Sequence, residues 1–515
     1  VLIPFVNFEL FDPVSDRIKM QWGFFHYHAS FKGLFYPPGS ILYKFLTSLR
    51  IPIAASEGES WINLGLVGSA LLFTMMFVSI LRLLTKNRTN RESLFTTENK
   101  IMLAGASLML IYAANYALYG FAKNWMENHL GPLLMFKASG RMAWSFYFAI
   151  TITGVVFLDK YLKKIKTQWL SYILLFVLCT IWFFDIRQYV GSKVKDAFHP
   201  NFFNSSSRQE MLNILDENKI DISQYQAILA LPKMVSWSDN FVSNINWSAQ
   251  FHSMRISAAT GLPMISAMLS RISTSHAAES IQMLAHPIIE RDILPKLPNQ
   301  KDLLLLVGVE YPPLTIGEQY LIDISTPLYK SNSFSLYRLS IDSLQQKRYM
   351  DEARFIYSQK LPLQKDAIHI SFDEENSSDS FYGKGSKLIH EGTTTLIDQA
   401  LSITADTHFV FSAWSKIEYD RHGLGVWEIT VSDSLGNVVF NERIDARKSA
   451  DIQDMWMRSE IIFPVREGFR LKVSIESNKD LYIDEILIYP VFSNNIIDMA
   501  EDDSFLLNGY KVHKQ

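Results

Sequence analysis

Four uncharged apolar runs in the first part of the chain constrain its fold more than any other feature. They cover Ile62–Leu81, Ile101–Ala122, Met142–Leu158 and Trp169–Phe184, and no further run follows in the 515 residues. A helix needs about 20 residues to cross a hydrocarbon core about 30 Å thick. In lipid the backbone must satisfy its own hydrogen bonds, which favours helices. The sequence therefore predicts an α-helical polytopic membrane region, residues 62–190, with four transmembrane helices at about 62–81, 101–122, 142–158 and 169–184.

The positions of Lys and Arg predict the orientation of these helices. Basic residues lie between the first two runs and between the last two, namely Arg82, Lys86, Arg88, Arg91, Lys100, Lys160, Lys163, Lys164 and Lys166. Short basic loops stay in the cytoplasm. We therefore expect a multi-pass protein of the cell (inner or plasma) membrane, with residues 1–61 and the C-terminal domains on the extracytoplasmic side.

The start of the chain predicts a longer protein. Val1 opens an external segment, and the apolar stretch Val1–Val6 is far too short for a signal peptide. We expect the chain to be the C-terminal portion of a protein with earlier helices; the alternative is an N-terminus that simply translocates.

Charge and cysteine content exclude some classes of function. The net charge of −3 leaves no basic stripe for nucleic acid. The single cysteine, Cys179, lies in the fourth run, which excludes an intrachain disulfide and a cysteine-based metal site.

Residues 1–61 form an aromatic-rich external or interfacial loop that contains three candidate site residues. His26 and His28 could offer two imidazoles to a metal if the segment is extended. The alternative is a pair of interfacial histidines bonded to backbone or lipid phosphate. A third ligand at a convincing spacing is missing, so no metal site is predicted. Glu57 lies just before the first run, either as a functional acid or as the complement of a helix N-terminus.

Two further candidates precede the third run. Lys137 and Arg141 flank Gly140, and arginine next to the first amides of a helix suits a phosphate group. The alternative is an arginine that reaches to the lipid headgroups.

Four short motifs carry a family resemblance over roughly residues 20–190. They read GFFHYH at 23–28, LFYPPG at 34–39, SEGESWINLGL at 56–66 and FKASGRMAW at 136–144. This series resembles a group of bacterial integral membrane proteins similar to the GT-C glycosyltransferase superfamily. The resemblance implies a polyprenyl-phosphate-linked sugar donor, a glycan acceptor and inversion at the anomeric carbon.

The same resemblance implies roles for the candidate residues. The catalytic acid of that superfamily follows a first helix that these residues lack, so the catalytic residues stay unknown. Arg141 and Lys137 would lie near the lipid phosphate, with His26, His28 and Glu57 lining the cavity. A divalent cation could assist by holding the charge of the leaving phosphate.

Residues 200–340 predict a small α/β domain. Ala227–Leu231, Leu303–Gly308 and Phe334–Leu339 are strand candidates, and Arg208–Glu217 and Ile316–Ile324 are helical. One cluster contains the serine and histidine residues that a Ser/His hydrolase needs, but no Gly-x-Ser-x-Gly elbow accompanies it. The cluster is His252, Arg255, Ser270, Arg271, Ser273, Ser275 and His276. We expect it to lie at a domain contact instead.

The last part of the chain predicts a linker helix over 341–366, an all-β sandwich (jelly roll) over 367–490 and a C-terminal tail over 491–515. The sandwich segments alternate apolar and polar residues with period two. The stretch Tyr482–Tyr489 resembles the last strand of jelly-roll carbohydrate-binding modules, which implies sugar binding by exposed aromatics. The available rings are Trp414, Tyr419, Trp427 and Trp456. The alternative is that these rings form the core.

The leading hypothesis from the sequence is a GT-C-type integral membrane glycosyltransferase acting in cell-surface glycan assembly, without its N-terminal catalytic part. The alternative is a non-enzymatic membrane-anchored scaffold or glycan-binding protein. A transporter is disfavoured because the centres of the four runs carry no ionisable residue.

Overall fold

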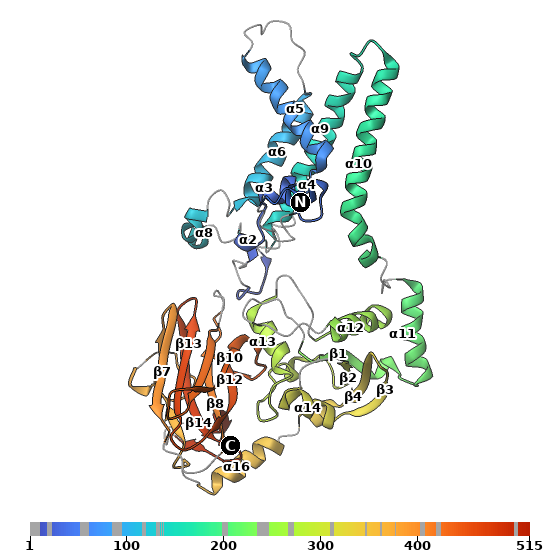
Figure 1. The fold of residues 1–515 in the computed structure, drawn as a ribbon. Helices are drawn as coiled ribbons and strands as arrows, with labels where there is room; N and C mark the ends of the chain where they lie inside the picture. Colours follow the sequence, from blue (N-terminus) through green and yellow to red (C-terminus); the bar gives the residue numbers. More distant parts are fainter. Residues whose placement is uncertain are drawn as a thin grey trace. The chain divides into compact units, whose positions relative to one another are not determined.

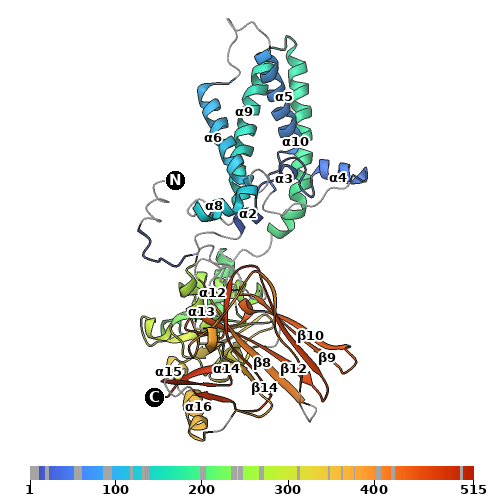
Figure 2. The same ribbon diagram turned by 90° about the vertical axis from the view of Figure 1, so that its left-hand side faces the viewer.

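The computed structural model divides the chain into two compact units (Figures 1 and 2). One unit, here the helical unit, is residues 19–200, and the other, the C-terminal body, joins residues 1–18 to 201–515. The structure describes residues 11–17, 23–51, 61–84, 95–115, 120–129, 134, 136, 138–197, 204–233, 241, 247–265, 272–309, 314–345, 348–360, 363–375, 377, 379–401, 407–418, 424–498 and 503–514.

The helical unit packs its long helices side by side. Its elements are α2 (Gly23–His26), α3 (Phe31–Phe35), α4 (Ile41–Ser48), α5 (Gly65–Leu84), α6 (Thr97–Ala113), η2 (Gly120–Ala122), α8 (Lys123–His129), η4 (Ser139–Ala143), α9 (Trp144–Leu162) and α10 (Gln168–Ala197). Met75 of α5, Ala106 of α6 and Phe157 of α9 share one apolar core. α5 and α9 run in one direction and α6 and α10 in the other (Figures 1 and 2).

Within the described residues, three helices are long and apolar enough to cross a membrane. They are Gly65–Leu84, Ser139–Leu162 and Gln168–Arg187. Most of their side chains are not buried within the structure, which is compatible with lipid contact. These segments confirm three of the predicted apolar helices.

The prediction of a fourth span at Ile101–Ala122 is wrong for the described residues. α6 begins earlier, at Thr97, where Thr96 caps it, and it ends at Ala113 after 17 residues. Just beyond this end the buried side chain of Asn115 donates to the Phe24 carbonyl (2.9 Å) and to the Ser139 hydroxyl (2.9 Å). The polar groups at this end of α6 therefore serve to join other segments of the helical unit.

A buried carboxylate fixes the start of α5. Asp185 of α10 is 3% exposed, and its Oδ2 accepts from the backbone N–H of Leu66 (2.7 Å). Gly65 has φ +69, and a Cβ at this position would meet the Asp185 carboxylate at 2.5 Å. The carboxylate thus satisfies an otherwise unpaired amide in the first turn of the helix.

The α/β part of the C-terminal body is built on a mixed sheet with strand order β1-β2-β4-β3 in the described residues. Its elements are α11 (Ser205–Glu217), η5 (Ile222–Gln224), β1 (Tyr225–Leu231), α12 (Trp247–Thr260), α13 (Thr274–Gln282), η6 (Leu294–Lys296), β2 (Asp302–Gly308), α14 (Ile316–Asp323), β3 (Thr326–Lys330), β4 (Phe334–Leu339), α15 (Ile341–Leu344) and α16 (Arg348–Ser358). β1 and β2 are parallel, and the other pairs are antiparallel. The predicted strands lie within β1, β2 and β4.

Both faces of this sheet are covered, which explains the continuous apolar runs of β1 and β2. Ile228 and Leu304 pack with α11 and α12 on one face. Leu229 and Leu305 pack with α13 and α14 on the other, and this second core continues into the sandwich.

The sandwich confirms the predicted all-β fold. Its elements are β5 (Ile368–Ile370), η7 (Asp373–Glu375), β6 (Lys387–Ile389), β7 (Gly392–Ala400), β8 (Thr407–Lys416), β9 (Val426–Ser432), β10 (Val438–Asp445), η8 (Ala446–Lys448), β11 (Ile452–Gln453), β12 (Trp456–Val465), β13 (Arg470–Ser477) and β14 (Leu481–Pro490). One sheet, here the open sheet, has the order β10-β9-β13-β7 in the described residues. The other, here the covered sheet, has the order β11-β12-β8-β14-β5, with β6 also on β14.

The residues predicted as a C-terminal tail form a further sheet instead, which corrects that prediction. This C-terminal sheet consists of β15 (Ile496–Asp498), β16 (Ser504–Leu507) and β17 (Tyr510–His513). Asn508 and Gly509 join β16 to β17 with φ angles of 51° and 83°. A two-residue Asn-Gly loop with both angles positive is the geometry that a tight hairpin needs.

Candidate functional site on the covered sheet

The structure brings the motifs at 23–28 and 136–144 together in the helical unit. The Ser139 hydroxyl donates to the Phe24 carbonyl (2.7 Å), and the backbone N–H of Gly140 donates to the Tyr27 carbonyl (2.7 Å). Phe24 and Ser139 are both fully buried. The two motifs therefore form one interlocked junction at an end of the helical unit.

His26, His28 and Arg141 all lie at this junction, with different surroundings. The His28 ring Nδ1 is 2.8 Å from the Phe25 carbonyl, the backbone partner that the sequence left open as an alternative. The His26 side chain is exposed, with its ring 4.7 Å from that of Tyr27. Arg141 is exposed, directly after buried Gly140. Glu57 and Lys137 lie outside the described residues, and the described His, Cys, Asp and Glu residues form no group that could hold a metal.

The tryptophans predicted as sugar platforms are core residues, which corrects their predicted role. Trp414 and Trp427 are fully buried and Trp456 is 3% exposed. Trp427 packs against Phe411 between the two sheets, with 5.1 Å between ring centroids. The burial of these three rings agrees with the alternative that they form the core. Tyr419 lies outside the described residues.

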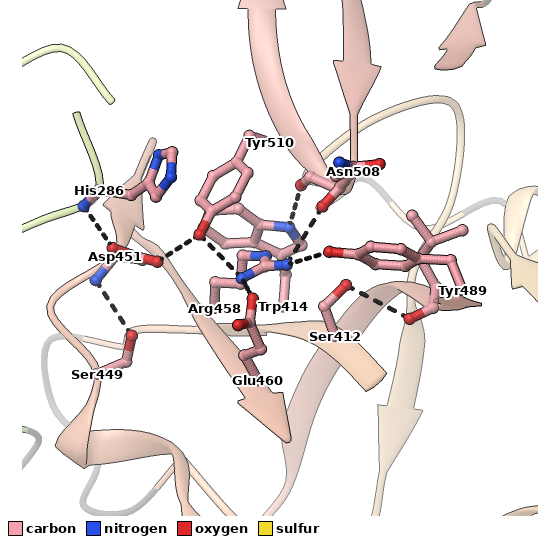
Figure 3. A network of polar contacts seen from close by, with 12 residues as sticks. His286, Ser412, Trp414, Ser449, Asp451, Arg458, Glu460, Tyr489, Asn508 and Tyr510 are labelled. Carbon is pink, nitrogen blue, oxygen red and sulfur yellow. Dashed lines mark hydrogen bonds and ion pairs between the residues drawn. The ribbon is translucent and has the colours of Figure 1, made fainter. Parts of the chain in front are cut away.

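The outer face of the covered sheet instead holds a buried polar network (Figure 3). β8 contributes Ser412 and Trp414, β12 contributes Arg458 and Glu460, and β14 contributes Tyr489. These residues share one face because alternate residues of a strand point the same way.

Arg458 is the centre of this network and is 1% exposed. It forms an ion pair with Glu460, and its Nη1 donates to the Tyr510 hydroxyl (3.0 Å). Its Nη2 donates to the Asn508 carbonyl (3.2 Å), and the guanidinium carbon lies 4.2 Å from the Tyr510 ring centroid. Burial raises the pKa of Tyr489 to about 12, so this neighbouring phenol stays protonated at neutral pH.

The Asn508–Gly509 turn of the C-terminal sheet fills the centre of the face. The Trp414 indole N–H donates to the Gly509 carbonyl (2.8 Å), while its ring stacks on Phe381 at 4.0 Å. A Cβ on Gly509 would come within 3.1 Å of the Ser412 hydroxyl. Only glycine therefore lets the turn approach this closely. The C-terminal sheet occupies the face that a ligand would need.

A second set of contacts joins the network to the α/β part. Asp451 accepts from the backbone N–H of His286 (2.8 Å) and from the Tyr510 hydroxyl (2.8 Å). The His286 ring stacks on Tyr510 at 4.6 Å. Burial lowers the pKa of His286, so its imidazole is neutral at neutral pH.

Lys233 forms a third link between the two parts. It follows β1, and its Nζ donates to the carbonyls of Arg447 (3.1 Å), Lys448 (3.2 Å) and Ser449 (2.6 Å) at the end of η8. Its backbone N–H donates to Glu318 Oε1 (2.7 Å). Burial lowers the pKa of Lys233 to about 7. The α/β part and the sandwich are thus joined by buried polar groups as well as by a shared apolar core.

The described residues of the serine- and histidine-containing cluster have separate structural roles. The His252 ring stacks on Phe334 (4.5 Å), Arg255 pairs with Glu210 (2.6 Å), and the Ser273 hydroxyl caps α13. The backbone N–H of Ser275 donates to Asp16 (2.7 Å), and the backbone carbonyl of His276 accepts from Ser280. Ser270 and Arg271 lie outside the described residues.

No sequence pattern described above predicted Arg458, Asp451, Tyr489 or Tyr510 as site residues. A signal for the network was nevertheless present, because the Asn508-Gly509 dipeptide lies between two apolar stretches and predicts a hairpin.

The open sheet presents a different, polar surface. Asn441 of β10 donates to Glu428 and Thr430 of β9 (both 2.9 Å). Arg470 of β13 pairs with Asp398 of β7 (2.6 Å). These side chains are half-buried or exposed and cross from strand to strand.

Comparison with family models assigns only the N-terminal part. A family described as a domain of unknown function (DUF6311) matches residues 3–187. No curated protein matches the chain in sequence. The match covers residues 19–187 of the helical unit, and it does not show the GT-C resemblance.

Comparison with solved structures finds likenesses that cover about a quarter of the chain. A family 16 carbohydrate-binding module has 16% identity over 23% of this chain and 82% of that chain, with a TM-score of 0.17. A family 22 xylan-binding domain from Paenibacillus barcinonensis has 14% identity over 25% and 85%, with a TM-score of 0.17. A ruminal family 26 endo-β-1,4-mannanase has 14% identity over 26% of this chain and only 28% of that enzyme, with a TM-score of 0.18.

Proposed function

We propose that this protein is a membrane-anchored scaffold of the cell envelope whose sandwich engages surface glycans. The helical unit holds the chain in the bilayer, and the C-terminal body is displayed on the extracytoplasmic side. The observation that carries the proposal is the way the α/β part and the sandwich are fastened into one body. Lys233 and Asp451 use their polar groups for this purpose, and Arg458 joins the C-terminal sheet to the sandwich.

Membrane anchoring is supported by the surface of the long helices. Phe73 and Phe77 of α5 are 57% and 61% exposed, and Phe176 of α10 is 72% exposed. Rings of this size on the outside of a helix pair are stable against lipid and costly in water. The basic residues after α5 and between α9 and α10 support a cytoplasmic location for those ends.

Glycan engagement is supported by the surface of the open sheet. Glu428, Thr430 and Asn441 lie next to one another and offer both donors and acceptors. Sugar hydroxyls need partners of both kinds, and groups held in place by one another lose little entropy on binding. We propose this patch, and not the buried tryptophans, as the glycan-contacting surface.

Glycan-array binding by the detergent-solubilised full chain tests this proposal. We expect binding that is lost in Asn441→Ala with Glu428→Ala and retained in the control Arg470→Ala, at an ion pair of the neighbouring strands. If the chain binds no glycan, or if both variants bind like the parent, the glycan-binding part is refuted.

A second candidate function is transfer of sugar from a polyprenyl-phosphate donor. The observation that favours it is the junction of the two motifs, which places Arg141 next to the segment that carries His26 and His28. In that mechanism Arg141 would hold the charge of the leaving phosphate. Donor consumption in membranes, compared between the parent and Arg141→Ala at equal protein level, tests it. Equal turnover in both would remove Arg141 from the mechanism.

A further inference from the structure

The helix α4 has an apolar side that its neighbours cover only in part. Ile41, Leu42, Phe45 and Leu46 recur at helical spacing, and Leu49 continues the same side. Lys44 and Thr47 lie on the opposite side, and Ser48 lies at the edge of the apolar side. No residue of α4 is buried, and Phe45 and Leu49 are 57% and 55% exposed.

The helix is nevertheless well formed, so its exposed apolar side is a defined surface of the protein. The Ser40 hydroxyl caps it by accepting from the backbone N–H of Tyr43 (3.2 Å). The Thr47 hydroxyl donates back to the Tyr43 and Lys44 carbonyls (2.9 Å each). The polar side therefore satisfies part of its own hydrogen bonding within the helix.

Backbone hydrogen bonds hold α3, the helix just before α4, near the start of α5. Ile62 and Asn63 donate to the Gly33 carbonyl (3.0 Å each), and Leu64 donates to the Leu34 carbonyl (2.9 Å). These bonds fix α3 against the residues that lead into α5. Phe35 of α3 also stacks on Phe73 of α5 at 5.5 Å.

The direction of α4 differs from that of the long helices. α4 packs against α10 and lies across its axis (Figure 2). An amphipathic helix that lies across membrane-spanning helices at their end is oriented to sit in the membrane interface. α5 and α10 also expose large apolar side chains, among them Phe73, Phe77 and Phe176.

We propose that α4 is an interfacial helix whose Phe45 side enters the boundary between headgroups and acyl chains. Lys44 and Arg50, both exposed, extend toward the phosphates of anionic phospholipids. The partner of this surface is thus a phospholipid leaflet. The proposal rests on the membrane anchoring proposed above and adds the site of contact with the leaflet at which α5 begins.

Nitroxide-lipid quenching of site-attached fluorophores tests this. In the full chain with Cys179→Ser, a single cysteine at Phe45→Cys, Lys44→Cys or Phe176→Cys carries an environment-sensitive dye. Each variant is placed in vesicles of neutral and anionic phospholipid. We expect quenching at position 176, several-fold stronger quenching at 45 than at 44, and a blue shift at 45.

Each of the other outcomes overturns a defined part of the proposal. Quenching at 176 with equal signals at 44 and 45 refutes the interfacial helix and leaves the membrane anchor standing. No quenching at any position refutes both. Should Phe45→Cys fail to fold, Leu49→Cys against Ser48→Cys repeats the comparison on the next turn of the helix.

Discussion

Arg458 carries a charge that the sandwich buries almost completely, so its partners determine whether the covered face is stable. Glu460, the Tyr510 hydroxyl and the Asn508 carbonyl share the guanidinium. Removing the guanidinium leaves the buried Tyr510 hydroxyl without this donor, and a buried polar group that loses its partner costs about 1–3 kcal/mol, whereas Glu460 is 34% exposed and keeps access to water. We therefore expect Arg458→Ala to lower the free energy of unfolding by about this amount in urea denaturation followed by tryptophan fluorescence.

Arg443 is the matched control for this prediction. It pairs with Glu476 on the open sheet, and both side chains are about half exposed. Exposed pairs contribute about 0–1 kcal/mol, so Arg443→Ala should change little. Equal losses in the two variants would show that the Arg458 network adds nothing special to stability.

Lys233 predicts a rise in stability with alkaline pH. Burial holds its folded-state pKa at about 7, below the ordinary 10.5. Between about pH 7 and 10.5 the unfolded chain binds more protons than the folded protein at this site, so unfolding becomes less favourable as pH rises. We expect the unfolding midpoint of the parent to rise over this window and Lys233→Met to flatten the rise. Lys448→Met, at an exposed neighbouring lysine, should retain it.

At the residue scale, sequence patterns assigned side chains to faces but not the burial of those faces. Trp414 and Trp456 alternate as strand residues on the outer side of a sheet, which by itself predicts exposure. The structure buries them because β15, β16 and β17, far along the chain, pack over that side. Such a long-range contact leaves no periodic signal near either tryptophan.

At the scale of elements, the Asn508–Gly509 turn allows the energetic cost of its backbone geometry to be separated from that of its packing. Gly509 has φ +83, and an added Cβ would crowd Ser412 at 3.1 Å; Gly436 has φ +85 with nothing within 4 Å. A left-handed alanine costs about 1–2 kcal/mol in either turn. We expect Gly509→Ala to lower the thermal midpoint more than Gly436→Ala. Equal shifts would show that the turn does not pack tightly on the covered sheet.

The start of α5 provides a test in the helical unit. Asp185→Ala removes the acceptor of the Leu66 amide, and loss of such a cap costs about 0.5–2 kcal/mol. Asp185→Asn keeps an acceptor oxygen and should retain most of the stability. The thermal midpoint in detergent, compared across parent, Asn and Ala, checks this order. An Asn variant as unstable as Ala would show that the charge, not the hydrogen bond, is required.

Elements with a strong local period were predictable, and those that depend on partners were not. The strands β8, β9, β12, β13 and β14 follow from alternation alone. α6 was overestimated because hydropathy continues past Ala113, whereas the helix ends where Asn115 bonds to Phe24 and Ser139. The C-terminal strands are four residues or fewer, too short for alternation to identify them.

In the whole molecule, residues 1–18 belong to the C-terminal body and not to the helical unit that follows them in the chain. Asp16 accepts from the backbone N–H of Ser275 (2.7 Å), so the segment before the helical unit belongs to the C-terminal body. The helical unit is therefore inserted between two pieces of that body.

Sidedness can be measured with single cysteines and a membrane-impermeant maleimide in intact cells. In the Cys179→Ser background we expect labelling at Asn441→Cys in the body and none at Lys164→Cys between α9 and α10 until the membrane is permeabilised. The physical reason is that Lys160, Lys163 and Lys164 resist translocation. With Cys179 restored as the only cysteine, its exposed thiol on α10 should stay unlabelled in either state because lipid surrounds it. Labelling at 164 in intact cells would reverse the topology, and labelling at 179 would place α10 in water and remove the anchor on which the proposed function rests.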